Sequence, residues 1–107
     1  MVAVAGGVGA CGGSDDGTAA VDASVTVKTF AFQPSPLQVK AGTTVTWTNT
    51  DDILHTATSG VRGSADDVFD LRLDGSGATA DVTFEQPGTF PYHCTIHPGM
   101  DGTVEVT

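Results

Sequence analysis

Three side chains with metal-binding chemistry follow one another at three-residue spacing near the C-terminal end of the sequence. They are a thiol, an imidazole and a thioether, from Cys94, His97 and Met100. Pro98 and Gly99 favour a tight loop here, and a loop can turn three such side chains toward one point, whereas a straight strand cannot. A second imidazole, His55, lies far upstream. In a sandwich of strands, two loops at the same end can bring these distant residues together.

The donor types restrict the metal that such a group would bind. Cys thiolate and Met thioether are soft ligands, whereas imidazole suits copper, zinc, iron or nickel. Structural zinc sites use Cys and His without Met and usually bring two cysteines at short spacing, but Cys94 has no such neighbour. Two His and one Cys with a weak axial Met is the ligand set of blue copper sites. The donor set therefore indicates copper.

Two other interpretations apply to the same residues. Cys94 is a structural thiol if it only fills the core, since free cysteines are commonly buried. A Cys–His pair is also typical of nucleophilic enzymes. However, no third group that would orient His97 is evident, and Met100 has no role in such an enzyme. We therefore favour metal binding over both.

The elements that must position these residues are strands. From residue 24 onward, apolar residues alternate with Thr or charged residues, which is typical of half-buried strands. Turn signals rich in Pro, Gly and Asp separate the strands, and no 3.6-residue periodicity indicates a helix. We expect an all-β fold, a Greek-key β-sandwich of about seven or eight strands. The alternating segments lie around residues 25–28, 44–49, 69–73, 80–85, 90–94 and 103–106.

Alternation also assigns individual side chains. We expect aromatic residues on inward rows to form the core, and His93 to face away from Cys94 as a surface residue. The Gly, Ser and Asp content of residues 60–67 predicts a loop. The expected core aromatics are Trp47, Phe84, Phe90 and Tyr92.

Length and charge exclude several classes of protein. The chain has 107 residues, which fits one domain. Thirteen acidic and four basic residues give a formal net charge of −9, which argues against nucleic-acid binding and against docking on an anionic membrane. The sequence contains no run of about 18 apolar residues, so it predicts no membrane-spanning helix. From residue 24 onward, ten acids and four bases remain.

Residues 1–23 differ from the rest of the chain and predict a signal remnant followed by a flexible linker. The run Val8-Gly9-Ala10-Cys11 resembles a lipobox, in which the Cys is lipidated after cleavage. The alternative is an unstructured tail with an incidental Cys. We therefore expect a domain over residues 24–107, with Cys11 as a lipidation site.

At the level of motifs, the sequence from about residue 24 to residue 107 resembles the small blue copper proteins, the cupredoxins of the plastocyanin, amicyanin and halocyanin group. The resemblance is carried by Val45-Thr46-Trp47-Thr48-Asn49, His55-Thr56, Pro87-Gly88-Thr89-Phe90 and Tyr92-His93-Cys94-Thr95-Ile96-His97-Pro98-Gly99-Met100. The short spacing from Cys to Met is similar to that of amicyanin.

The resemblance implies a ligand set and an electron path. His55, Cys94 and His97 would form the trigonal copper plane, with Met100 as the axial ligand. His97 would lie at the surface in an apolar region with Pro98, and electrons would leave through its imidazole edge.

Two residues depart from the family pattern beside the ligands. Position 96 is often Pro in the family and is Ile here, which restores a backbone N–H close to the Cys94 sulfur. We hypothesise that this N–H stabilises the thiolate and raises the reduction potential. Thr56 stands where the family often has Asn, which leaves the tether between the two ligand loops, near Thr95, open.

The function expected is one-electron transfer between Cu(I) and Cu(II) outside the cytoplasm, not catalysis. The alternatives are copper storage or delivery with the same ligands, and a binding module whose metal site is incidental. We expect a monomer that meets redox partner proteins with a basic docking surface and touches a membrane only through a lipid anchor. The pairs Asp51-Asp52 and Asp66-Asp67 are either solvated loop charge or an acidic docking patch for such a basic partner.

Overall fold

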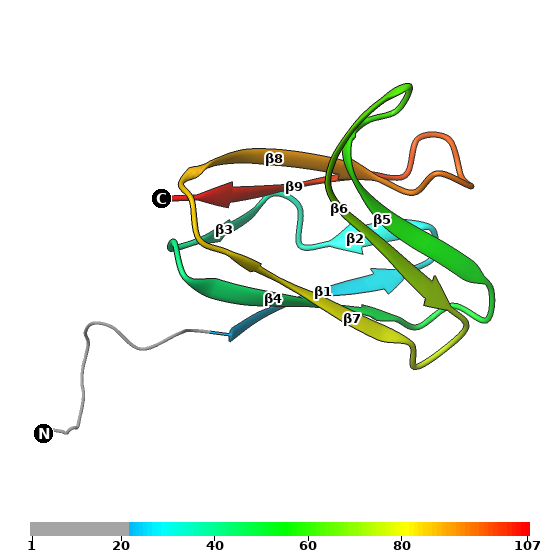
Figure 1. Cartoon of the computed structure of the whole chain (residues 1–107). Coiled ribbons are helices and arrows are strands. Elements are labelled where there is room, and N and C mark those ends of the chain that lie inside the picture. The colour runs from blue at the N-terminus through cyan, green and yellow to red at the C-terminus, as the bar shows by residue number, and fades with distance from the viewer. Residues whose placement is uncertain (1–21) are drawn as a thin grey trace, which may run out of the picture.

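The computed structural model describes residues 22–107, which form two β-sheets that pack face to face (Figure 1). One sheet has four strands in the order β2-β1-β4-β7, and the other has five in the order β3-β9-β8-β5-β6. The strands of this part of the chain are β1 (Asp22–Lys28), β2 (Ala31–Gln33), β3 (Leu37–Val39), β4 (Thr43–Asn49), β5 (Leu54–Val61), β6 (Ser64–Asp74), β7 (Thr79–Phe84), β8 (Gly88–His93) and β9 (Asp101–Val106).

The expected all-β sandwich is confirmed, with nine strands rather than seven or eight and no helix in residues 22–107. β5 is not among the alternating segments, because four of its residues in a row, 57–60, are buried. The other two strands outside those segments are β2 and β3, which have three residues each and are too short to show an alternating pattern. They lie on opposite sides of the Pro34-Ser35-Pro36 segment, where the chain crosses from one sheet to the other. The pairs β1–β4 and β3–β9 are parallel, and the other strand pairs are antiparallel.

The core lies between the sheets and is centred on Trp47 of β4, which is fully buried. The Tyr92 ring from the opposite sheet meets the indole edge to face, with the centroids 5.4 Å apart, and the Phe69 ring lies at 5.6 Å. Such edge contacts add to the free energy of burying the rings. The prediction that Trp47, Phe84 and Tyr92 are core residues is confirmed, whereas Phe90 packs half-buried against this core.

Two expectations are wrong, and for one reason. Residues 60–67 do not form a loop but belong to the β5–β6 hairpin, in which only residues 62 and 63 lie outside the strands. His93 is not a surface residue: it is 4% exposed because this hairpin covers it. The pairing that places the hairpin over β8 includes Thr58 with His93. A long-range contact of this kind leaves no periodic trace in the sequence.

The described residues contain no helix that is long and apolar enough to cross a membrane. The expected signal remnant and linker fall almost wholly outside these residues, and so does Cys11. Those expectations stay predictions.

Candidate metal centre

His55 lies in β5, directly after the turn that follows β4, and it is fully buried. Its Nε2 lies 2.8 Å from Oδ2 of Asp51. Because a carboxylate only accepts hydrogen bonds, the proton is on Nε2 and the lone pair is on Nδ1. A carboxylate on the far nitrogen is a common way to orient a metal-binding histidine. His55 is thus held in the tautomer that leaves Nδ1 free to bind a metal.

Asp51 also supports the turn between β1 and β2. Its carboxylate accepts backbone N–H bonds from Thr29 at 2.9 Å and from Phe30 at 3.2 Å. Both of these residues have positive φ angles, 53° and 60°, which costs conformational energy for residues other than glycine. The Thr29 N–H first, and then the His55 ring, lower the pKa of Asp51, which favours its ionised form. One carboxylate therefore holds both a strained turn and a histidine.

Cys94, His97 and Met100 occupy the loop between β8 and β9, and two backbone bonds close that loop. The Cys94 N–H donates to the Met100 carbonyl at 2.9 Å, and the Met100 N–H donates to the His97 carbonyl at 3.2 Å. Cys94 and Met100 are buried, while His97 is half-buried. The tight turn expected from Pro98 and Gly99 thus brings the three side chains to one end of the sandwich.

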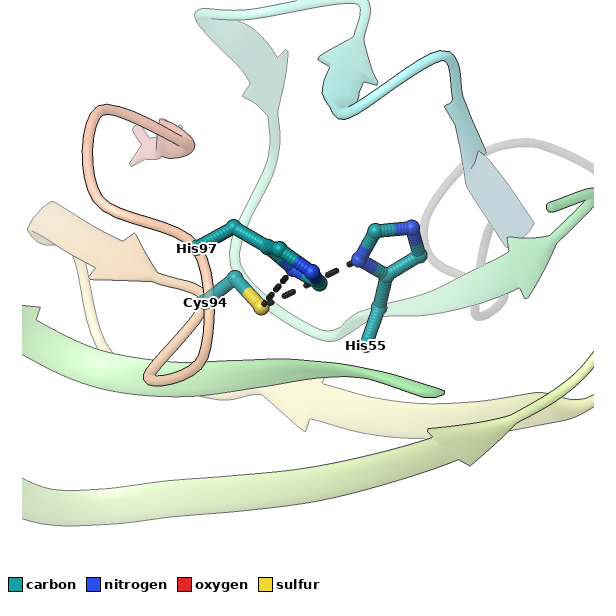
Figure 2. A group of neighbouring side chains, drawn as sticks. All are labelled: His55, Cys94 and His97. Carbon is teal, nitrogen blue, oxygen red and sulfur yellow. Dashed lines mark hydrogen bonds between the residues drawn. The ribbon is translucent and has the colours of Figure 1, made fainter. Parts of the chain in front are cut away.

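The structure brings the two distant segments together (Figure 2). The ligand atoms of His55, Cys94 and His97 all lie within 4.8 Å of one another. The Cys94 sulfur lies 3.4 Å from Nδ1 of His97 and 3.9 Å from Nδ1 of His55. Both imidazoles therefore turn Nδ1 toward the sulfur, and Met100 lies near this group.

The surroundings of the Cys94 sulfur favour the thiolate, which is the form that binds metals. Burial by itself raises the pKa of the thiol, but hydrogen bonds outweigh it and lower the pKa to about 6. The largest of these comes from the Thr56 N–H, at 3.4 Å from the sulfur. The Ile96 N–H also contributes.

Thr56 and Thr95 tether the two ligand segments to each other. The Thr95 N–H donates to Oγ1 of Thr56 at 2.9 Å, and the two hydroxyls lie 3.2 Å apart. The Thr56 backbone meanwhile donates to the Cys94 sulfur. The tether that the sequence left open is therefore built from a threonine hydroxyl.

Phe30 is a site residue that sequence reasoning missed. Its ring makes edge contacts with both imidazoles, at centroid distances of 5.0 Å to His97 and 5.6 Å to His55. The ring is 53% exposed, so it forms part of the surface at this end of the molecule. No sequence signal marked Phe30. Asp51 could have been identified from the sequence, because it lies four residues before His55.

This donor set fits copper. A thiolate, two imidazoles that turn Nδ1 toward the sulfur and a buried thioether are soft and borderline ligands, and the thioether excludes the usual structural zinc site.

Comparison with known proteins also indicates copper binding. The family described as "Copper binding proteins, plastocyanin/azurin family" matches residues 19–107. Amicyanin-alpha of Methylorubrum extorquens is 42% identical over 84 residues, which cover 77% of this chain and 69% of that protein. Halocyanin of Natronomonas pharaonis is 40% identical over 80 residues, which cover 72% of this chain and 48% of that protein. The chain thus spans between about half and two thirds of the length of these relatives.

Solved structures show the same fold. A purple cupredoxin from Nitrosopumilus maritimus superposes with a TM-score of 0.73 at 31% identity, over 80% of this chain and 100% of that one. The Cu(I) form of an amicyanin mutant gives a TM-score of 0.65 at 32% identity, over 85% of this chain and 87% of that one.

The fold and the donor set define a cupredoxin, a small β-sandwich with a copper centre between two loops. The chain belongs to the plastocyanin/azurin family of copper-binding proteins. Copper is therefore its cofactor, and membership of this family indicates a blue copper electron carrier rather than an enzyme.

Proposed function

We propose that His55, Cys94 and His97 would hold copper as the three strong ligands, that Met100 would be a weaker fourth ligand, and that the protein carries single electrons outside the cytoplasm. The convergence of the three ligand atoms within 4.8 Å carries this proposal. Bound copper supplies the one-electron couple between Cu(I) and Cu(II). The chain's own residues hold the ligands, exclude water and present a route to a partner.

The frame around the ligands supports electron transfer rather than bond-making. His55 is fixed by Asp51, and the Cys94 loop is tied to the His55 segment through Thr56. His55, Cys94 and Met100 are each at most 2% exposed. Four protein ligands leave no position for a substrate, and a stiff frame keeps the ligand positions similar in both oxidation states.

His97 is the ligand that reaches the surface, because it is half-buried while the other three are buried. Three loops carry exposed apolar side chains, which are Phe30, Ile53 and Ile96. Phe30 lies in the turn between β1 and β2, and its ring packs against His97. Ile96 lies in the same loop as His97, and Ile53 lies in the turn before β5. Redox encounters use small interfaces of this kind. We infer that a redox partner docks here and exchanges one electron through the His97 edge.

The charge of the domain favours a basic partner. From residue 24 onward, ten acids face four bases, and opposite charge on a partner would speed their encounter. The finer expectations also stay proposals: a monomer, an extracytoplasmic location and a lipid anchor at Cys11. Loss of membrane association on Cys11→Ser would support the anchor, and unchanged fractionation would oppose it.

The first experiment is to add one equivalent of Cu(II) to the purified protein and record visible absorption and EPR spectra. We expect an intense blue thiolate-to-copper band and a narrow copper hyperfine splitting. Cys94→Ser replaces a single sulfur atom by oxygen and should abolish the band. A pale wild-type spectrum would contradict the proposed ligand set. Ready loss of copper to a chelator, without reversible redox cycling, would instead favour storage or delivery.

A further inference from the structure

The tip of the β5–β6 hairpin lies beside the end of β8, where the ligand loop between β8 and β9 begins (Figure 1). A register shift between Thr58 and Gly60 bends this hairpin. Such bulges re-aim the residues that follow them. Gly60 has a φ of +97°, and a Cβ there would lie 2.5 Å from the Ser64 carbonyl oxygen. The sequence therefore allows the two strands of the hairpin to approach closely at this point.

Two contacts attach the hairpin to the segment that carries Cys94. The carbonyl of Gly60 accepts a hydrogen bond from Nδ1 of His93, at 2.8 Å. The guanidinium of Arg62, in the turn of the hairpin, donates to the carbonyl of Cys94 itself. A hydrogen bond from an ionised donor is stronger than one between neutral groups.

The peptide unit between Cys94 and Thr95 is therefore held at both ends. Arg62 holds its carbonyl oxygen, and Oγ1 of Thr56 accepts its N–H. Rotation of this unit would move the residue that carries the sulfur, so both bonds oppose it. The Cys94 N–H is engaged separately, with the Met100 carbonyl.

Arg62 also places a positive charge beside the Cys94 backbone. Within residues 22–107, no carboxylate lies within ion-pair distance of Arg62, whereas Arg72 on the same hairpin lies 3.7 Å from Asp74. A fixed positive charge near a thiolate-bound metal favours the reduced state, because one-electron reduction lowers the positive charge of the site. The charge of Arg62 is therefore free to act on the centre.

We propose that Arg62 is a positioning residue of the metal centre, which locks the Cys94–Thr95 peptide through the Cys94 carbonyl and raises the reduction potential through its charge. This inference rests on the proposed copper site. It assigns to the β5–β6 hairpin a role in setting the potential at which the protein accepts its electron from a donor.

The test compares Arg62→Gln with Arg72→Gln, which removes the same charge from the same hairpin at a residue that pairs with Asp74 and makes no bond to the Cys94 carbonyl. In the metal-free proteins we measure amide hydrogen exchange at Thr95. In the copper-loaded proteins we measure the reduction potential. Thermal unfolding of each metal-free variant shows whether it is folded, and Arg62→Lys keeps the charge without the planar fork of donors.

For Arg62→Gln we expect exchange at Thr95 to become about tenfold faster. We expect the equilibrium constant for reduction to fall about two- to threefold, which is about 18 to 28 mV for a one-electron couple. Arg62→Lys should keep the potential while exchange quickens, and Arg72→Gln should change neither quantity.

The proposal is overturned if Arg62→Gln and Arg72→Gln show the same rate of amide exchange at Thr95, or the same reduction potential. A wild-type protein without the blue band would instead contradict the copper site itself. The exchange rates of the metal-free proteins would still report whether Arg62 holds the ligand loop.

Discussion

Asp51 shows how much one side chain can organise at this centre. It accepts a hydrogen bond from His55 and two backbone bonds from the turn that carries Phe30. The same carboxylate therefore orients a proposed ligand and holds the ring that covers both imidazoles. Its interpretation as plain solvated loop charge misses this role.

We expect Asp51→Asn to weaken copper binding about tenfold, because the partners that orient a metal-binding histidine usually contribute that much to affinity. Asp52→Asn is the matched control, since it removes the same charge from the next, exposed residue. Competition with a chelator measures both affinities. Equal affinities in the two variants would contradict the role of Asp51.

Ile96 tests the hydrogen bonding of the sulfur. Ile96→Pro removes the backbone N–H that helps to lower the pKa of Cys94, so we expect a lower reduction potential. Ile96→Val keeps the N–H and the branched side chain and should leave the potential unchanged. Voltammetry of the copper-loaded proteins measures the difference, and an equal or higher potential in Ile96→Pro would refute the hypothesis.

At the scale of elements, the β5–β6 hairpin depends on a glycine that no other residue can replace without strain. A Cβ at Gly60 would lie 2.5 Å from the Ser64 carbonyl oxygen and 2.8 Å from the Ala65 Cα. Gly63 has a similar φ of +84°, but a Cβ there would meet nothing within 4 Å. The two positions therefore separate the cost of backbone conformation from the cost of a steric clash.

We expect Gly63→Ala to lower the free energy of unfolding by about 1 to 2 kcal/mol, the cost of a Cβ in a left-handed conformation. Gly60→Ala should lose about 1 to 3 kcal/mol more, because strands must move apart to admit the methyl group. Urea unfolding of the metal-free proteins measures both. Equal losses would show that the hairpin can open at no cost.

At the scale of the whole molecule, the formal net charge of −9 governs encounters. We expect electron transfer with a small cationic oxidant to slow several-fold as ionic strength rises from about 10 to about 200 mM, because salt screens attraction between exposed charges. A small anionic oxidant should react faster over the same range. Stopped-flow bleaching of the blue band measures both rates, and identical salt responses would show that net charge does not steer the encounter.

Much of the architecture was predictable because it is local. Alternation along β4 predicts that Val45 and Trp47 face inward, and both are fully buried. Cys94, His97 and Met100 lie within one loop, so their closeness in the sequence keeps them close together in the fold. The short strands β2 and β3 were not predictable, because three residues cannot display a period of two.

The sequence alone determined the donor types, their order and the strand pattern of this protein, because these depend on residue identity and near neighbours. Only the tertiary structure decided which distant groups meet them. His93 is buried and Cys94 is held by Arg62 because a bulged hairpin folds over β8. Asp51 and Phe30 join the centre because two loops meet at one end of the sandwich. Such contacts between segments far apart in the chain follow from packing, which no periodicity of the sequence records.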